Sequence, residues 1–228
     1  FTDLVLLRDG MITTLKVPST PADPSQAVLD GLRQLVPAGV AFDLVHGSTV
    51  ATNALLERRG ARVVLVTNRG FEDVIEIGRQ NRPQLYALVG HRPPPLVARE
   101  DRLGVAGRLG PDGAEIEPLD PAELHDLAAR VARHSPDSIA VALLHSYADP
   151  RHEQAVASAL ATAGVPVSVS SEIVPEFREY ERTSTTVVNA YVAPVVDRYL
   201  GRLAAEAGAH RVRIMGSNGG ALPLERAR

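Results

Sequence analysis

Apolar and turn residues at the start of the chain predict a β-hairpin followed by a helix. Residues 4–7 and 11–17 read as two strands, and the Asp9-Gly10 pair between them is a strong hairpin turn signal. The helix is predicted to begin at Asp23-Pro24, because Asp is a favoured N-cap and Pro suits the first helical position. Its apolar face recurs at helical spacing through Val28, Leu29, Leu32, Leu35 and Val36.

Beyond this point, short apolar runs alternate with helical patterns. The predicted strands are residues 42–45, 62–67, 102–109, 138–144, 165–169 and 212–215. The predicted helices are residues 49–59 with Gly60 as the C-cap, 71–77, 120–133, 149–163 and 175–207, the last broken or kinked at Pro194. The alternation predicts an α/β fold with a mainly parallel sheet behind an antiparallel hairpin.

Composition narrows the class of protein. The chain has 228 residues, 45% of them hydrophobic and 22% charged, which is typical of one large or two small globular domains. A net charge of −3 gives no electrostatic footprint for nucleic acid or an anionic membrane. No apolar run approaches the roughly 20 residues that a membrane span needs. The chain begins on Phe1, almost inside a strand, so we expect a fragment or a chain with a disordered start.

Two residue types exclude whole chemistries. There is no cysteine, which excludes thiol nucleophiles and disulfides, and fits the reducing cytoplasm that we expect for this protein. Lys16 is the only lysine, and it lies outside any GxxxxGK[ST] pattern, which excludes a P-loop. There is also no GxSxG elbow of the kind that serine hydrolases carry.

Ligands of open α/β sheets bind beyond the carboxyl ends of the strands. The predicted strands therefore select residues 46–53, 67–70, 145–147, 170–172 and 217–220. The first segment carries Ser48, Thr49 and Asn53 at a helix start, a pattern that suits either a bound anion or simple N-capping. Capping, worth about 1 kcal/mol, is the simpler interpretation.

Further polar clusters lie outside these segments. Arg79, Gln80, Asn81 and Arg82 come together just before a proline, where arginine suits anionic or carbonyl-rich ligands and where loops are polar by default. Glu179 and Arg182 are three residues apart on one predicted helix, so they share a face and are expected to pair. The four hydroxyls of residues 183–186 indicate a polar interior or a ligand surface.

Histidine is a common metal ligand, so the histidines of the chain are candidates for a metal site. Asp43, His46, His145 and His152 offer oxygen and imidazole ligands, but no short H-x₃-H spacing or HExxH motif is present. We therefore favour hydrogen-bonding or structural roles over a metal site.

Several sequence blocks together resemble the hydantoinase A/oxoprolinase family, which includes N-methylhydantoinase A, 5-oxoprolinase and the nucleotide-binding subunit of acetone carboxylase. They are FTDLVL, HGSTVATNALLERRGARVVLVTNRGFEDVIEIGRQNRP, RPPPLV, LLHSYADPRHE, SSEIVPEFREYERTSTTVVNAYVAP and MGSNGG, in order along the whole chain.

The resemblance implies a fold and an activity. The fold is a ribonuclease H-like lobe of the actin/sugar-kinase/Hsp70 type with a mixed sheet, over residues 1–190, and the start of a second, hydantoinase A-type lobe over residues 191–228. The activity is ATP-dependent hydrolysis of a cyclic amide of the hydantoin or 5-oxoproline type, through phosphorylation of its carbonyl oxygen. ATP and Mg²⁺ are the implied cofactors, and a hydantoinase B-type subunit or domain in an oligomer is the implied partner.

The resemblance also implies roles for residues in the matching blocks. Thr2 and Asp3 are expected near the γ-phosphate or its Mg²⁺, and Asp3 and Arg79 are the expected catalytic residues. The expected substrate-binding residues are His46, Thr49, Asn53, Gln80, Arg82, Glu179, Arg182, Asn218 and Gly219.

The family's first phosphate loop is similar to D-x-G-G-T-F-T-D, and this chain begins at its Phe. We therefore expect that the chain alone does not bind ATP tightly and is inactive, and micromolar binding in a calorimetric titration would contradict this. The alternatives are a lobe that docks a partner without catalysis, the ATP-dependent subunit of a ketone carboxylase, and a small-molecule kinase. Hydantoins, 5-oxoproline, lactams and ketones all remain open as substrates.

Overall fold

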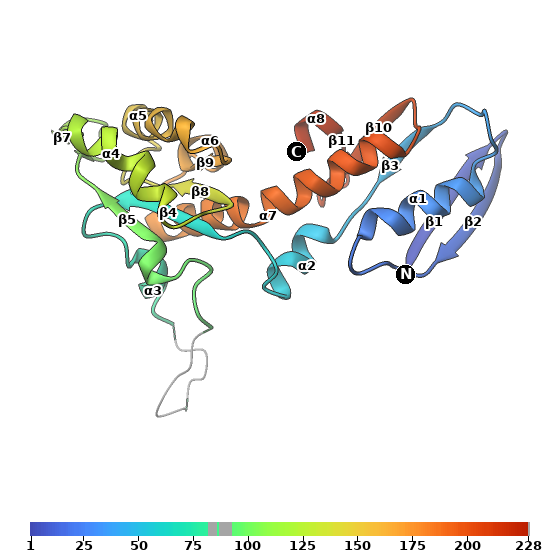
Figure 1. The fold of residues 1–228 in the computed structure, drawn as a ribbon, viewed down its shortest axis with the longest axis horizontal. Helices are drawn as coiled ribbons and strands as arrows, with labels where there is room; N and C mark the ends of the chain where they lie inside the picture. The colour runs from blue at the N-terminus through green and yellow to red at the C-terminus, as the bar shows by residue number, and fades with distance from the viewer. Residues whose placement is uncertain (82–85, 87–92, 228) are drawn as a thin grey trace. The chain divides into compact units, whose positions relative to one another are not determined.

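A computed structural model of the chain describes residues 1–81, 86 and 93–227 (Figure 1). They form two compact units, one of Phe1–Glu57 with Val195–Arg228 (unit 1) and the other of Arg58–Pro194 (unit 2). Helix α7 (Glu179–Glu206) contributes residues to both units. The family-based domain division at residue 190 stays a prediction.

The hairpin of unit 1 forms as predicted. Strand β1 (Thr2–Arg8) pairs antiparallel with β2 (Met11–Val17). Asp9 and Gly10 both have positive φ, 51° and 78°, as a tight hairpin turn of the type that favours Asp-Gly requires. Helix α1 (Pro24–Leu35) begins at the predicted cap, where the Asp23 carboxylate accepts the Ser25 N–H at 3.1 Å. The buried side of the hairpin packs on α1 and on the end of α7.

A second sheet of unit 1 has the strand order β11-β10-β3. Strand β3 (Asp43–His46) lies parallel to β10 (Arg211–Met215), and β11 (Ala221–Pro223) is antiparallel to β10. Neither β11 nor the short helix α8 (Leu224–Ala227) was predicted, because three or four residues are too few to show a period.

Helix α2 (Val50–Leu56) is shorter than predicted. Arg58, not Gly60, takes a left-handed conformation after it, with φ of 57°. Gly60 serves packing instead, because a Cβ there would lie 2.2 Å from the ring of Tyr191. The predicted C-cap role of Gly60 is therefore wrong.

Unit 2 contains the predicted parallel sheet, in the order β5-β4-β8-β9. Its strands are β5 (Arg102–Val105), β4 (Val63–Asn68), β8 (Ser138–Val141) and β9 (Val167–Val169), and neighbouring strands all pair in parallel. Every residue of β4 is buried, which explains its unbroken apolar run.

Helices cover both faces of this sheet. Helices α4 (Pro121–Ala132) and α5 (Arg151–Leu160) share one core cluster with β4 and β8, and they lie together beside these strands in Figure 1. On the other face, Ser138 Oγ of β8 donates to the backbone oxygen of Ala190 in α7 at 2.6 Å. Among the described residues, no helix is both long and apolar enough to cross a membrane.

Short elements complete unit 2. They are α3 (Val74–Ile77), η1 (Arg99–Asp101), β6 (Arg108–Leu109), β7 (Glu115–Glu117), η2 (Ala161–Ala163) and α6 (Ser170–Ile173). The strand predicted over residues 102–109 is broken, because Gly107 has φ of 98° and β6 leaves to pair with β7. Gly164, with φ of 71°, follows η2 and closes this helical segment as predicted.

Helix α7 begins four residues later than predicted. Arg178 has φ of 80°, which cannot continue into a helix, so residues 175–178 lie outside it. Pro194 lies inside α7 without ending it. The helix thus runs on through the boundary between the two units.

Candidate functional site

Two of the predicted ligand segments meet at the carboxyl edge of the β3–β10 pair in unit 1. The parallel register places His46 beside Ile214, so the loops that follow both strands start next to each other. A Cβ on Gly47 would lie 4.0 Å from the Cβ of Met215. Residues 46–53 and 217–220 therefore leave the same edge of one sheet, as the strand-end rule predicts.

His46 is the buried anchor of this edge. Its Nε2 lies 2.6 Å from the Tyr199 hydroxyl of α7, and both side chains are buried. Burial lowers the pKa of His46, and it raises the pKa of Tyr199 against an opposing hydrogen bond with Ser48. A neutral imidazole and a protonated phenol result, so the hydroxyl can donate to an unprotonated Nε2. The predicted substrate contact of His46 stays a prediction.

Thr49 and Asn53 lie exposed at the start of α2. The Asn53 amide donates to Thr49 Oγ1 at 3.3 Å, and Thr49 makes no side-chain capping bond. Ser48 Oγ takes the capping role by accepting the Val50 N–H at 3.2 Å. Capping therefore explains Ser48 but leaves the exposed side chains of Thr49 and Asn53 on the surface of the edge.

Asn218 and Gly219 form the turn between β10 and β11. The Gly216 N–H donates to the Gly220 oxygen at 2.7 Å, and Asn218 Oδ1 accepts the Gly220 N–H at 3.3 Å. Gly219 has φ of 88°, a conformation that favours glycine. Local backbone geometry thus accounts for these residues, and their predicted ligand role remains a prediction.

Thr2 and Asp3 belong to the hairpin, a separate two-stranded sheet. The Asp3 carboxylate lies 3.1 Å from the Lys16 ammonium, and both side chains are exposed. Lys16 thus lies exposed on the second strand of the hairpin. The predicted phosphate and Mg²⁺ roles of Thr2 and Asp3 are not tested by this arrangement.

Arg182 is the centre of a buried network in unit 2. Its guanidinium pairs with Glu179, as predicted, and donates to Ser146 Oγ and, at 2.8 Å, to the Leu143 oxygen. Only 1% of Arg182 is exposed, so its side of the pair is buried. The network holds the loop after β8 against the start of α7.

Buried Glu153 extends this network to the loop after β9. Its carboxylate accepts the Leu143 N–H at 2.8 Å, the Ser170 hydroxyl at 2.6 Å and the Ser171 N–H at 2.8 Å. Arg182 Nε and Ser171 Oγ are buried without a partner among the described residues. Described contacts therefore make Arg182 and Glu179 anchors of the sheet edge, and their predicted substrate contacts stay predictions.

Arg79 and Gln80 lie exposed near the start of α7. Arg79 Nε donates to Glu181 Oε1 at 2.7 Å, and this hydrogen bond lowers the pKa of the Glu181 carboxyl. Gln80 has φ of 57°, and its N–H donates to the Ile77 oxygen at 3.3 Å. Arg82, the third predicted residue of this segment, lies outside the described residues.

An open cavity of about 390 Å³ adjoins Arg79 within unit 2. The hydroxyls predicted for residues 183–186 divide around α7: Thr183 and Thr186 are buried, whereas Ser184 and Thr185 line this cavity. The polar-interior interpretation is therefore confirmed for Thr183 and Thr186, and the ligand-surface interpretation of Ser184 and Thr185 stays a prediction. The complete lining is Arg79, Asn81, Tyr180, Glu181, Ser184 and Thr185.

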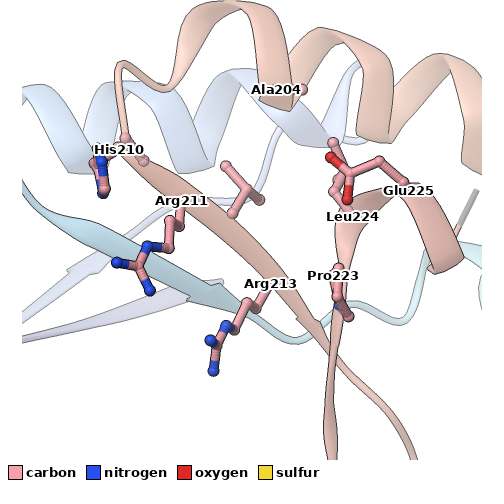
Figure 2. A pocket seen from close by; sticks show the side chains of 9 residues that line it. Ala204, His210, Arg211, Arg213, Pro223, Leu224 and Glu225 are labelled. Atoms are coloured by element: carbon pink, nitrogen blue, oxygen red, sulfur yellow. The ribbon is translucent and has the colours of Figure 1, made fainter.

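A second cavity, of about 410 Å³, lies in unit 1 at the amino end of β10. Figure 2 shows Arg211 and Arg213 extending from the same side of β10, away from Ala204 of α7. No residue that we predicted for the site lines this cavity. It lies at the opposite end of β10 from the edge that carries residues 46–53 and 217–220.

Sequence reasoning missed three residues that shape these sites. Tyr199 reaches His46 across 153 positions, and Glu181 meets Arg79 across 102, so no local spacing reveals either pair. Glu153 is fully buried although Glu is among the residues least often buried. Within the described ranges, no group of three or more His, Asp or Glu side chains could hold a metal ion.

The architecture is that of a mixed α/β protein with several sheets, whose polar segments lie at the carboxyl ends of parallel strands. The chain belongs to the hydantoinase/oxoprolinase family. It matches the hydantoinase/oxoprolinase N-terminal region over residues 1–164 and the hydantoinase/oxoprolinase region over residues 182–228. The resemblance inferred from the sequence blocks is thereby confirmed.

Named relatives differ in their chemistry. The chain is 38% identical to the caprolactamase subunit alpha of Pseudomonas jessenii, over 98% of this chain and 35% of that protein. It is 35% identical to 5-oxoprolinase 1 of Arabidopsis thaliana, over 79% of this chain and 16% of that protein. It is 32% identical to the acetophenone carboxylase gamma subunit of Aromatoleum aromaticum, over 84% of this chain and 30% of that protein.

Solved structures share the fold. The crystal structure of the ATP-dependent caprolactamase from Pseudomonas jessenii matches with a TM-score of 0.85 at 35% identity, covering 98% of this chain and 35% of that one. The nucleotide-free acetone carboxylase matches with a TM-score of 0.83 at 25% identity and the same coverage. The chain thus spans about a third of the length of these proteins.

Proposed function

We propose that this chain is part of the ATP-dependent subunit of an enzyme that hydrolyses a cyclic amide by phosphorylating its carbonyl oxygen. The observation that carries the proposal is the family match over both regions, together with 38% identity to a caprolactamase subunit and 35% identity to a 5-oxoprolinase. The fold fits a lobe of the actin/sugar-kinase/Hsp70 type. A hydantoinase B-type subunit or domain is the proposed partner, since two of the relatives are named as subunits.

ATP and Mg²⁺ are the proposed cofactors, toward which this chain would supply the Asp3 carboxylate that pairs with Lys16. Mg²⁺ is commonly held by one or two carboxylates together with substrate phosphates, and Asp3 offers one exposed carboxylate. The β3–β10 edge offers the exposed side chains of Thr49, Asn53 and Asn218 as neutral hydrogen-bonding groups. When bound, ATP would supply the phosphoryl group.

Arg79 is the residue of this chain proposed to act on the substrate. Its guanidinium is permanently charged and rich in donors, so it can stabilise negative charge that develops on a carbonyl oxygen. Gln80 lies beside it, exposed on the same loop. The Arg182 network would keep the neighbouring α7 start fixed while Arg79 acts.

ATP hydrolysis by the complete protein with its partner subunit tests the proposal. We expect that 5-oxoproline, hydantoin or a lactam stimulates phosphate release, and that Arg79→Ala lowers the stimulated rate roughly 10- to 100-fold, as loss of a charged hydrogen bond predicts. Arg133→Ala is a matched control, because Arg133 lies exposed at the end of α4. No stimulation by any cyclic amide would overturn the proposal.

A ketone carboxylase subunit is the second candidate. The 32% identity to an acetophenone carboxylase subunit and the structural match to acetone carboxylase favour it. ATP hydrolysis that requires bicarbonate and a ketone, and ignores cyclic amides, would select this function instead.

A further inference from the structure

The cavity beside α7 has a composition that differs from an ordinary polar surface. It brings a cation, an anion and hydroxyl groups together in about 390 Å³, from a loop and one helix face of unit 2. Ser184 and Thr185 follow Glu181 by about one helical turn, so the three residues share that face. Arg79 reaches them from the loop after α3.

One fixed pair dominates the cavity. Arg79 Nε and Glu181 Oε1 are 2.7 Å apart. A guanidinium carries five N–H donors and a carboxylate about four acceptor positions, so this bond, the one side-chain bond that the described residues give the pair, uses little of either group's capacity. The pair thus presents a donor and an acceptor side by side toward the cavity.

The hydroxyl groups add to this polarity. Thr185 Oγ1 donates to the Glu181 backbone oxygen at 2.8 Å, which leaves its lone pairs as acceptors. Ser184 and Tyr180 contribute two more hydroxyls to the lining, and the Tyr180 ring packs near Gly78, which fixes one side of the cavity.

We infer that this cavity recognises the cis-amide edge of a cyclic amide, with Arg79 donating to the carbonyl oxygen and Glu181 accepting the adjacent N–H. A ring forces its amide into the cis form, so that C=O and N–H point to the same side and match a donor beside an acceptor. An open-chain amide is almost always trans and presents these groups on opposite sides. The inference rests on the proposed function and adds Glu181 to it as the residue that selects substrates with an N–H.

The hydrogen bond from Arg79 supports the role of Glu181 as the acceptor of the substrate's N–H. Glu181 has a pKa lowered chiefly by the Arg79 hydrogen bond, so it stays ionised and cannot act as a donor near neutral pH. The exposed pair contributes little to stability, so replacing either residue should leave the fold intact.

Two small probes separate the two contacts. 2-Pyrrolidone has both C=O and N–H, whereas N-methyl-2-pyrrolidone has only C=O. Their binding to the complete protein with its partner subunit is measured by calorimetry for wild type, Glu181→Ala, Arg79→Ala and Glu117→Ala. Glu117 is an exposed carboxylate of β7 in the same unit and serves as the matched control.

We expect wild type and Glu117→Ala to prefer 2-pyrrolidone by about tenfold or more, the typical effect of a hydrogen bond to a charged group. Glu181→Ala should reduce this preference to less than about twofold, whereas Arg79→Ala should weaken both probes. Equal binding of the two probes to wild type, no binding of either, or a preference that survives Glu181→Ala would each overturn the inference.

The two proposals fail separately. If cyclic amides stimulate ATP hydrolysis but the N–H preference does not depend on Glu181, this recognition site is wrong and the proposed function stands. If the preference depends on Glu181 but no cyclic amide stimulates ATP hydrolysis, the recognition site stands and the proposed function is wrong.

Discussion

At the scale of single residues, Arg182 shows how a buried charge can fix the loops at the carboxyl edge of the β4–β8–β9 sheet. Its guanidinium joins Glu179, the loop after β8 and the serine that follows β9. Removing one partner of such a buried pair leaves the other charge uncompensated. Arg182→Met should therefore destabilise the protein by about 3–5 kcal/mol in urea unfolding.

The control for Arg182 is Arg133→Met, because Arg133 is exposed and its replacement should change stability by less than about 0.5 kcal/mol. Equal stability of the Arg182 variant and wild type would contradict the anchoring role.

His46 makes a prediction about pH. Burial lowers its folded-state pKa below the unfolded value of about 6.5, so the folded state disfavours the charged imidazole. The stability that neutral His46 contributes is fully present above pH 6.5 or so and is lost as the pH falls through the folded-state pKa. His46→Gln should flatten stability against pH in this acidic window, as measured by unfolding at a series of pH values. An unchanged slope would show that His46 is not the titrating group.

At the scale of elements, Gly60 couples the start of β4 to α7. A Cβ at position 60 would lie 2.2 Å from the Tyr191 ring, and the Ala61 N–H donates to the Tyr191 oxygen at 2.8 Å. Gly60→Ala should therefore cost about 1–3 kcal/mol by overpacking. Gly47→Ala, where the nearest atom is 4.0 Å from the new methyl group, is the control measured by the same thermal unfolding.

Adding Tyr191→Leu to Gly60→Ala tests the cause. The smaller side chain removes the ring that the new methyl group meets, so the double variant should lose less stability than the two single changes added together. Additive losses would show that Gly60 serves another purpose.

Local signals predicted most of the elements. The D-G turn, the Asp23-Pro24 cap and the apolar run of β4 each act within a few residues, and each matches the structure. The errors arise from a single backbone angle and from a very short element. Arg178 has φ of 80°, so α7 begins only after it, and β11 is only three residues long.

The candidate site was predictable only in part. The rule for parallel strands placed residues 46–53 and 217–220 beyond strand ends, and the β3–β10 pairing, which the sequence did not predict, brings them to one edge. The exposure of each side chain was not predictable, since Arg182 is buried by contacts with residues 12 to 39 positions away. Glu181 was not predicted as a site residue, because its partner Arg79 is distant in sequence.

At the scale of the whole molecule, the chain represents about a third of the solved proteins that it resembles. The family match, the polar loops at the β3–β10 edge of unit 1 and the polar cavity of unit 2 support the proposed ATP-dependent step on a small polar substrate. In the proposed reaction, the carbonyl oxygen of the cyclic amide receives the phosphoryl group of ATP. That oxygen can be followed with an isotope.

The most direct measurement uses a cyclic amide labelled with ¹⁸O at its carbonyl, incubated with ATP, Mg²⁺ and the complete protein with its partner subunit. If the carbonyl oxygen is phosphorylated, one water adds to the amide carbon and the C–N bond breaks, which opens the ring and leaves an acyl phosphate. A second water then attacks the same carbon and the C–O bond to the phosphate breaks, so the ¹⁸O leaves in inorganic phosphate. We predict one labelled oxygen per phosphate released in the amide-dependent reaction. Amide-dependent phosphate that carries no ¹⁸O would contradict the account.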